Sequence, residues 1–116
     1  MKHDKPAHPL EHHPSYRAVI AAAPPLAEFA AEVTAARELV GTLAMACGDL
    51  AEGFAAPPAS RRRITAHHRA WQAVREIDRA VVAAKRRRLA SPAVVARVQR
   101  AIDRADVLIE ALLPAS

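Results

Sequence analysis

Arginine side chains gather in one segment of this 116-residue chain, between residues 61 and 88. At about 100° per residue in a helix, most of them fall on one side, opposite an apolar side. A guanidinium presents a planar fork of donors that suits phosphate, and each neutralised phosphate releases counterions. The segment therefore predicts a surface that binds the backbone of RNA or DNA without reading its sequence. The residues assigned to it are Arg61, Arg62, Arg63, Arg69, Arg75, Arg79, Lys85, Arg86, Arg87 and Arg88.

A solvated helix face is the alternative interpretation of the same arginines. Glu76 could pair with some of them, and cations near the C-terminal end of a helix also suit its dipole. No aromatic side chain interleaves with them to stack on bases, because Trp71 falls on the apolar side. Charge favours a binding surface: residues 1–60 hold four Lys/Arg against seven Asp/Glu, whereas residues 61–116 hold thirteen against five. A basic half suggests nucleic acid, an acidic protein or an anionic membrane surface as partner.

The histidines and the single cysteine do not have the spacing of a metal or catalytic site. His67 and His68 are adjacent, so they point about 100° apart on a helix and cannot ligate one metal together. His12 and His13 lie in a His-rich N-terminal segment, and no Cys/His spacing typical of zinc occurs. Cys47 falls on an apolar seam, as a small buried residue does. We therefore expect no enzyme, no metal and no cofactor.

The composition favours helices as the elements that position these residues. Alanine is abundant, and only 3% of the chain is aromatic. Alanine loses no side-chain entropy in a helix, and no run alternates with the period of a strand. Small side chains bury little area each, so a bundle of this size should be marginal alone and should gain from self-association. No apolar run is long enough to span a membrane and no signal-peptide core begins the chain, so we expect a cytoplasmic protein without a membrane partner.

The N-terminal half predicts a tail followed by one helical-bundle domain. Residues 1–14 are rich in His, Pro and Lys and predict a disordered tail, with the domain spanning 15–116. Ser15 could cap a short helix that ends at Ala23, because Pro24-Pro25 should stop it. Residues 26–54 predict the next helix, with a coiled-coil-like seam. The seam comprises Phe29, Val33, Ala36, Val40, Leu43, Cys47, Leu50 and Phe54.

The C-terminal half predicts two further helices. Ser60 should cap a helix from Arg61 to Arg88, on which Asp78 is the one acid of the apolar side. Asp78 either pairs with a base across the bundle or lies at a subunit contact. Ser91-Pro92 should start the last helix, which ends before Pro114.

The ordered series of residues from 38 to 113 resembles a bacterial family, the small four helix bundle proteins encoded in intervening sequences of large-subunit ribosomal RNA genes. Gly48-Asp49-Leu50-Ala51-Glu52-Gly53-Phe54 closes the second long helix as the family's Asn-Ile-Ala-Glu-Gly-Phe does, with Asp49 in place of Asn. Arg75-Glu76-Ile77-Asp78 resembles the family's Ala-Glu-Leu-Glu. Ser60 and Ser91 stand where the family begins its third and fourth helices.

The resemblance implies an up-down four-helix bundle that assembles as a pentameric ring with a positively charged surface. It gives Asp49, Glu52, Gly53 and Glu76 structural roles. A distant relative of the family, the accessory variability determinant of diversity-generating retroelements, binds a reverse transcriptase and nucleic acid. The hypothesis is therefore a non-catalytic homo-oligomer that binds nucleic acid non-specifically, as an accessory to a reverse transcriptase or another RNA-handling partner. The alternative is a scaffolding module that mediates protein–protein interaction.

Overall fold

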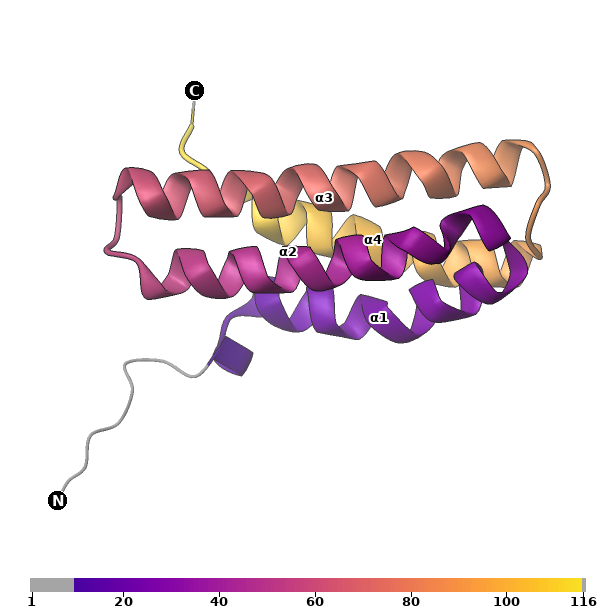
Figure 1. Cartoon of the computed structure of the whole chain (residues 1–116), viewed down its shortest axis with the longest axis horizontal. Helices are drawn as coiled ribbons and strands as arrows, with labels where there is room; N and C mark the ends of the chain where they lie inside the picture. Colours follow the sequence, from indigo (N-terminus) through magenta and orange to yellow (C-terminus); the bar gives the residue numbers. More distant parts are fainter. Residues whose placement is uncertain (1–9, 116) are drawn as a thin grey trace, which may run out of the picture.

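Four α-helices lie side by side along the long axis of the molecule (Figure 1). The structure is a computed structural model that describes residues 10–115. The helices are α1 (Pro14–Glu32), α2 (Arg37–Ala55), α3 (Arg61–Arg86) and α4 (Pro92–Glu110). Short 3-10 helices precede α1 (η1, Leu10–His12) and α2 (η2, Thr34–Ala36), and no strand occurs in the described part of the chain. The all-α, four-helix prediction is confirmed.

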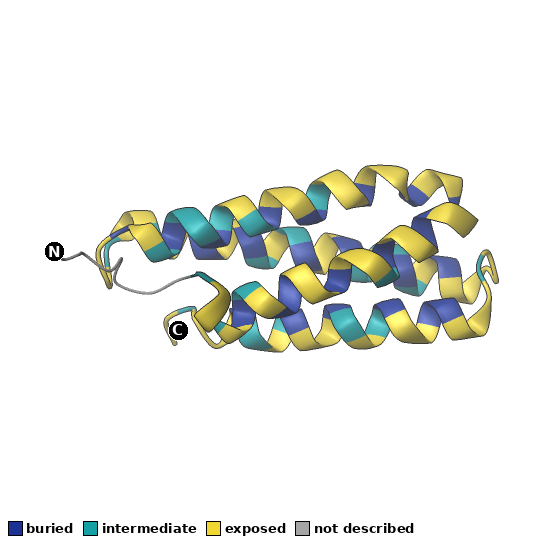
Figure 2. Ribbon diagram, turned by 90° about the horizontal axis from the view of Figure 1, so that it is seen from below, coloured by how far each residue is buried: buried dark blue, intermediate teal, exposed yellow. Residues whose placement is uncertain are grey.

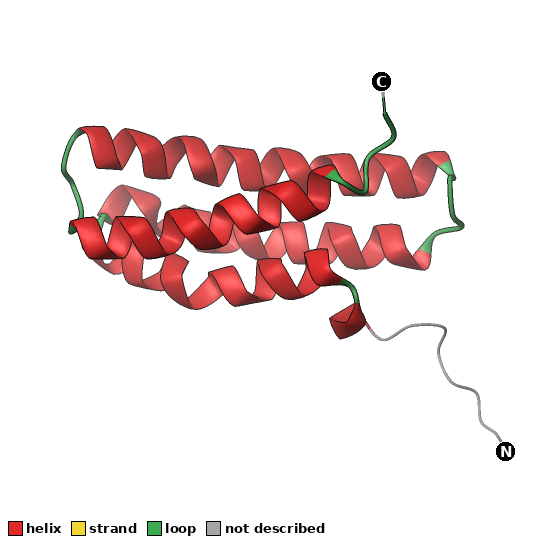
Figure 3. Ribbon diagram, turned by 180° about the vertical axis from the view of Figure 1, so that it is seen from behind, coloured by secondary structure: helices red, strands yellow, loops and turns green. Residues whose placement is uncertain are grey.

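Successive connections lie at opposite ends of the bundle, so each helix is antiparallel to the next (Figure 3). α1 packs against α2 and α4, and α3 packs against the same two helices. This up-down order follows from connections that are too short for a crossover.

The core is built from small side chains. Each helix contributes at least one fully buried alanine, namely Ala22, Ala46, Ala70 and Ala105. Figure 2 shows the buried residues on the inner side of each helix and the exposed residues outward. Small residues at these positions let the helix backbones approach closely, but each buries little area. The largest fully buried side chains are Phe29, Leu26, Leu50, Ile77, Ile102 and Ile109.

The first helix is longer than predicted. α1 continues through Pro24 and Pro25, and Ser15 is buried within its first turns instead of capping it. Pro14 begins the helix, which suits a residue without an N–H group. The prediction of a stop at Ala23 is wrong because buried side chains on both sides of the prolines, from Val19 to Phe29, pack in one core. That packing outweighs the backbone hydrogen bonds that the prolines remove.

The predicted N-terminal tail, residues 1–14, lies only partly within the described residues. Residues 1–9 lie outside them, whereas Leu10–His12 form a 3-10 helix and Pro14 begins α1. The His13 ring stacks on Phe54 of α2, with 3.7 Å between ring centroids. Contact with a residue so distant in sequence holds a segment whose composition predicts disorder.

The predicted helix over 26–54 is interrupted. Val33 is extended, with φ −122° and ψ 98°, and the 3-10 turn Thr34–Ala36 follows it. The interruption resets the helical register, so the expected seam is wrong in part: Val40 is 43% exposed. β-Branched Val33 and Thr34 favour extended backbone, and no Gly or Pro marks the turn. The residues of α2 that face the core are Leu39, Leu43, Ala46, Leu50 and Gly53.

The starts of the last two helices are as predicted. Ser60 Oγ accepts a hydrogen bond from Arg63 N at 3.2 Å, and Ser91 Oγ accepts one from Val94 N at 3.4 Å. α3 ends at Arg86, two residues before the predicted end, and Arg88 has a left-handed φ of 56°. Both N-caps were predictable because the capping bond is local.

Candidate nucleic-acid interface

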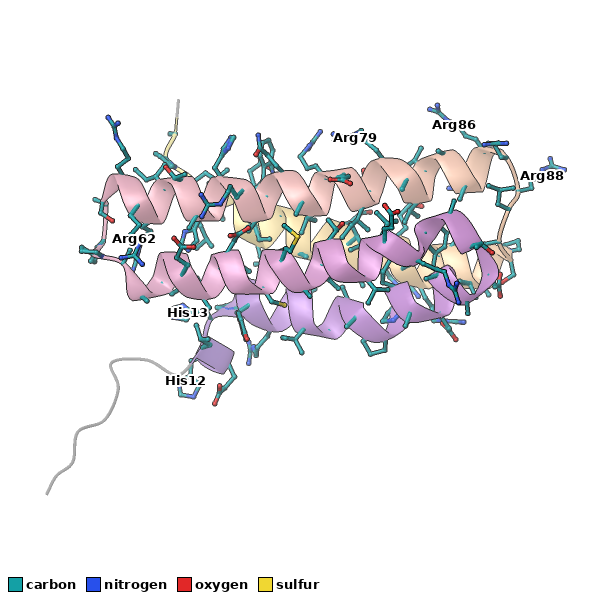
Figure 4. All side chains as sticks on the ribbon, in the orientation of Figure 1. His12, His13, Arg62, Arg79, Arg86 and Arg88 are labelled. Carbon is teal, nitrogen blue, oxygen red and sulfur yellow. The ribbon has the colours of Figure 1, made fainter. Side chains whose placement is uncertain are left out.

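The ten predicted basic residues lie on α3 and just beyond it, and they differ in what surrounds them. Arg62 points toward α2, whereas Arg79, Arg86 and Arg88 point away from the bundle (Figure 4). Apart from Arg61, the arginines of the N-terminal part of α3 contact carbonyl groups or acids of neighbouring helices. Those of its C-terminal part do not, so the predicted surface divides into two regions.

Arg63 caps the C-terminal end of α2. Its Nε donates to the carbonyl oxygen of Gly53 at 2.9 Å. Its Nη2 donates to the carbonyls of Phe54 at 3.0 Å and Ala56 at 2.9 Å. The Gly53 carbonyl also accepts the backbone N–H of Ala56 at 3.1 Å. The last carbonyls of a helix lack the full set of intrahelical donors, so a charged donor is well placed there. Arg63 therefore has a structural role, with its Nε and Nη2 engaged by α2 and the residue after it.

Asp49 and Glu52 of α2 face the arginines of α3. Arg69 Nε lies 3.4 Å from Asp49 Oδ1, and Arg69 Nη2 lies 3.2 Å from Glu52 Oε1. Arg62 Nε lies 3.6 Å from Glu52 Oε2. These acids join α2 to α3 and neutralise part of the predicted basic surface. These pairs are partly exposed and add little stability.

Arg75 is held by a contact between α3 and α4. The Trp71 Nε1 donates to Asp106 Oδ1 at 2.8 Å, and Arg75 Nη1 lies 3.7 Å from Asp106 Oδ2. The Arg75 guanidinium also lies over the Trp71 ring, 5.0 Å from its centroid. Sequence reasoning did not identify Asp106. The available signal was Trp71 itself, since an indole N–H near the core needs an acceptor.

The residues at and after the last turns of α3 form an unpaired basic group, which we call the α3 C-terminal cluster (Arg79, Lys85, Arg86, Arg87 and Arg88). All five are exposed, and no described acid lies within ion-pair distance of them. Glu76, predicted as a possible partner, is exposed and pairs with no described base. The cluster therefore offers guanidinium and ammonium groups to an external anion. Arg61, at the other end of α3, is exposed as well.

The side of α3 that faces α4 is acidic. Burial first, and then the charges of Asp78 and Asp106, raise the pKa of Asp103. Asp78 thus interacts with the carboxylate of Asp103 and not with the predicted base. No ion pair of Asp78 occurs among the described residues. Its other predicted place, a subunit contact, stays a prediction. These acids disfavour a phosphate backbone on that side of α3.

His67 is the most deeply buried titratable group near this surface, with 2% of its area exposed. It makes a backbone hydrogen bond with Leu50, while its Nε2 has no partner among the described residues. Burial, the Arg63 charge and His13 lower the pKa of His67 below its usual 6.5, against the opposite effect of the Leu50 bond. A Cβ built on Gly53 would overlap the His67 ring, so this glycine is needed for close approach.

Metal ligands and the cysteine are two further features of the described residues. No group of three His, Cys, Asp or Glu within residues 10–115 could hold a metal ion. Burial raises the pKa of the Cys47 thiol, which opposes formation of a thiolate. Among the described helices, none is long and apolar enough to cross a membrane. Comparison with protein-family models, with curated proteins and with solved structures found no match.

Proposed function

We propose that this chain binds the phosphate backbone of nucleic acid non-specifically, through the α3 C-terminal cluster. The observation that carries the proposal is that these five basic side chains are exposed and pair with no acid among the described residues. Arg63, Arg69 and Arg75, in contrast, are engaged within the bundle. Phosphate contacts by guanidinium groups are strong and insensitive to sequence. No base-stacking aromatic accompanies the cluster, which agrees with backbone binding alone.

Self-association and an accessory role complete the proposal. A core of small residues supports self-association, because contacts between copies would add buried area. The resemblance to the four helix bundle proteins implies five copies, and it implies a reverse transcriptase or another RNA-handling enzyme as partner. Several copies would present several basic clusters, and this would raise the affinity for a long polyanion.

The binding test compares two variants that change the net charge equally. One is Arg79→Glu with Arg86→Glu, within the cluster. The other is Arg17→Glu with Arg104→Glu, at exposed positions of α1 and α4. Retention of RNA and of duplex DNA is measured at low and moderate salt. We expect the cluster variant to lose about tenfold or more in affinity, with a shallower salt dependence, and the control to lose less than about threefold.

The outcomes separate this proposal from simple solvation of the helix face. No binding by the parent protein at low salt would contradict it, as would binding that is indifferent to salt. Equal losses in the two variants would show that net charge acts without the cluster. The scaffolding alternative predicts a protein partner that persists in a pull-down after nuclease treatment. Val40 and Met45 of α2 are exposed apolar side chains that such a partner could contact.

A further inference from the structure

The outer face of α2 is apolar, and no described residue covers it. Every exposed position of α2 between Glu38 and Asp49 is apolar or glycine. Met45 is 69% exposed and Val40 is 43% exposed. A contiguous exposed apolar surface of this kind marks an interaction site. We call it the α2 outer face and define it as Val40, Gly41, Ala44, Met45 and Gly48.

The neighbouring helix extends this uncharged surface. α1 packs beside α2 and has no charged residue between Arg17 and Glu28. Its exposed positions in that interval include Ile20, which is 49% exposed. A specific interface needs about 800 Å² from each partner, more than one helix face supplies, so the surface of α1 is a needed flank.

The two glycines of the α2 outer face have no packing reason inside the chain. A Cβ built on Gly41 or Gly48 would meet no atom within 4 Å, in contrast to Gly53. Glycine is a poor helix former, so Gly41 and Gly48 weaken the middle of α2, and no close packing within one copy compensates for them. What they permit is the close approach of another backbone from outside.

Spacing and charge indicate that the occupant is a second copy of α2. In an antiparallel pair about a two-fold axis, each contact occurs twice. With the axis between Ala44 and Met45, Gly41 of one copy faces Gly48 of the other. In the same register Arg37 faces the other copy's Glu52. Arg37 is exposed and pairs with no acid in the described residues, so each end of the contact gains an opposite-charge pair.

We infer that two copies of this chain dock antiparallel through the α2 outer face, with Gly41 against Gly48 and Arg37 against Glu52. The inference rests on the self-association in the proposed function, and it assigns that association two copies in place of the five that the resemblance implies. Within the α3 C-terminal cluster, Arg79 lines a surface hollow together with Met45, whereas Lys85 and Arg88 line another hollow beside α4. Docking through α2 therefore leaves the C-terminal end of each cluster exposed to nucleic acid.

The first test places like charges at the axis. Ala44→Glu brings two carboxylates together across the contact, and Ala96→Glu makes the same change at an exposed alanine of α4. Mass is measured by light scattering and sedimentation over a range of micromolar concentrations, with circular dichroism to show that both variants are helical. We expect twice the chain mass for the parent and the control, whereas five times the chain mass would overturn this contact in favour of the ring that the resemblance implies. We expect at least a hundredfold weaker association for Ala44→Glu.

The second test reads the register. Arg37→Glu and Glu52→Arg should each weaken association about tenfold, and the double variant should recover to within about threefold of the parent. In a Cys47→Ser background, Ala44→Cys should form a disulfide-linked dimer under mild oxidation, whereas Ala96→Cys should not. The double variant restores the charge pair between copies, but it does not restore the contacts of Glu52 within one copy. Recovery in the double variant therefore reports the contact between copies.

The outcomes distinguish this contact from the broader proposal. A parent protein that is monomeric throughout the micromolar range would overturn both the α2 contact and the proposed self-association. An assembly of any size whose mass is unchanged by Ala44→Glu would overturn the contact and leave self-association standing. Retention of RNA by the same variants tests nucleic-acid binding separately.

Discussion

The two parts of α3 have similar composition but different surroundings. In the N-terminal part, Arg63 donates to three carbonyls of α2 and Arg69 faces Asp49 and Glu52. In the C-terminal part, Arg79 and Arg86 project from the bundle without a described acid beside them. The difference shows that a stripe of like residues on a helix wheel is not one functional unit. Neighbouring helices decide which members stabilise the fold and which are available to a partner.

Removing one arginine from each part should give the largest contrast in stability. Arg63→Ala should lower the free energy of unfolding by about 2–4 kcal/mol, because three carbonyl acceptors lose a charged donor. Arg86→Ala should change it by less than about 0.5 kcal/mol. Urea unfolding followed by circular dichroism measures both. Equal effects would show that Arg63 is not a cap.

Filling the space at Gly53 should have the next largest effect. Gly53→Ala should cost about 1–3 kcal/mol, because the added methyl group overlaps His67. In a His67→Ala background the same change should cost less, since the obstructing ring is gone. A double-mutant cycle in urea gives the coupling. Additive losses would mean that the glycine serves backbone conformation and not the approach of His67.

Acidification should lower the stability of the fold through His67, in the N-terminal part of α3. The pKa of His67 in the folded protein is lowered from 6.5, so the unfolded chain binds more protons between that value and the lowered one. Stability therefore rises with pH across this interval and falls as pH decreases below about 6.5. The urea midpoint measured from pH 7.5 to pH 5 should fall for the parent and stay flatter for His67→Gln. A midpoint independent of pH would contradict a neutral, buried His67.

The contact between α3 and α4 should give the smallest change. Asp106→Asn keeps an acceptor for the Trp71 N–H group but removes the charge beside Arg75. We expect a loss of about 0.5–1 kcal/mol, as for a partly exposed ion pair, with a changed Trp71 fluorescence. Asp103→Asn is the matched control and should be neutral or stabilising, because the pKa of Asp103 is already raised by burial and nearby acids. A larger loss at Asp103 would contradict this assignment of the two acids.

Local chemistry made part of the fold predictable. The caps at Ser60 and Ser91, the alanine-rich helices and the side of α3 that holds the arginines follow from residues close in sequence. The passage of α1 through Pro24-Pro25 does not, because contacts with distant segments decide it. The division of the basic surface could not be predicted from local sequence either. It depends on Asp49, Glu52 and Asp106, which lie 17 to 35 residues from their partners on α3.

The central claim is that the two parts of α3 differ in availability to nucleic acid, and one binding measurement tests it directly. Arg62→Gln with Arg69→Gln and Arg79→Gln with Arg86→Gln remove the same charge from the two parts of the helix. Affinity for single-stranded RNA is measured as a function of salt for both variants and the parent. The account predicts about a tenfold loss and a reduced salt slope for the second variant, with a loss below about threefold for the first. Equal losses, or a greater loss at Arg62 and Arg69, would contradict it.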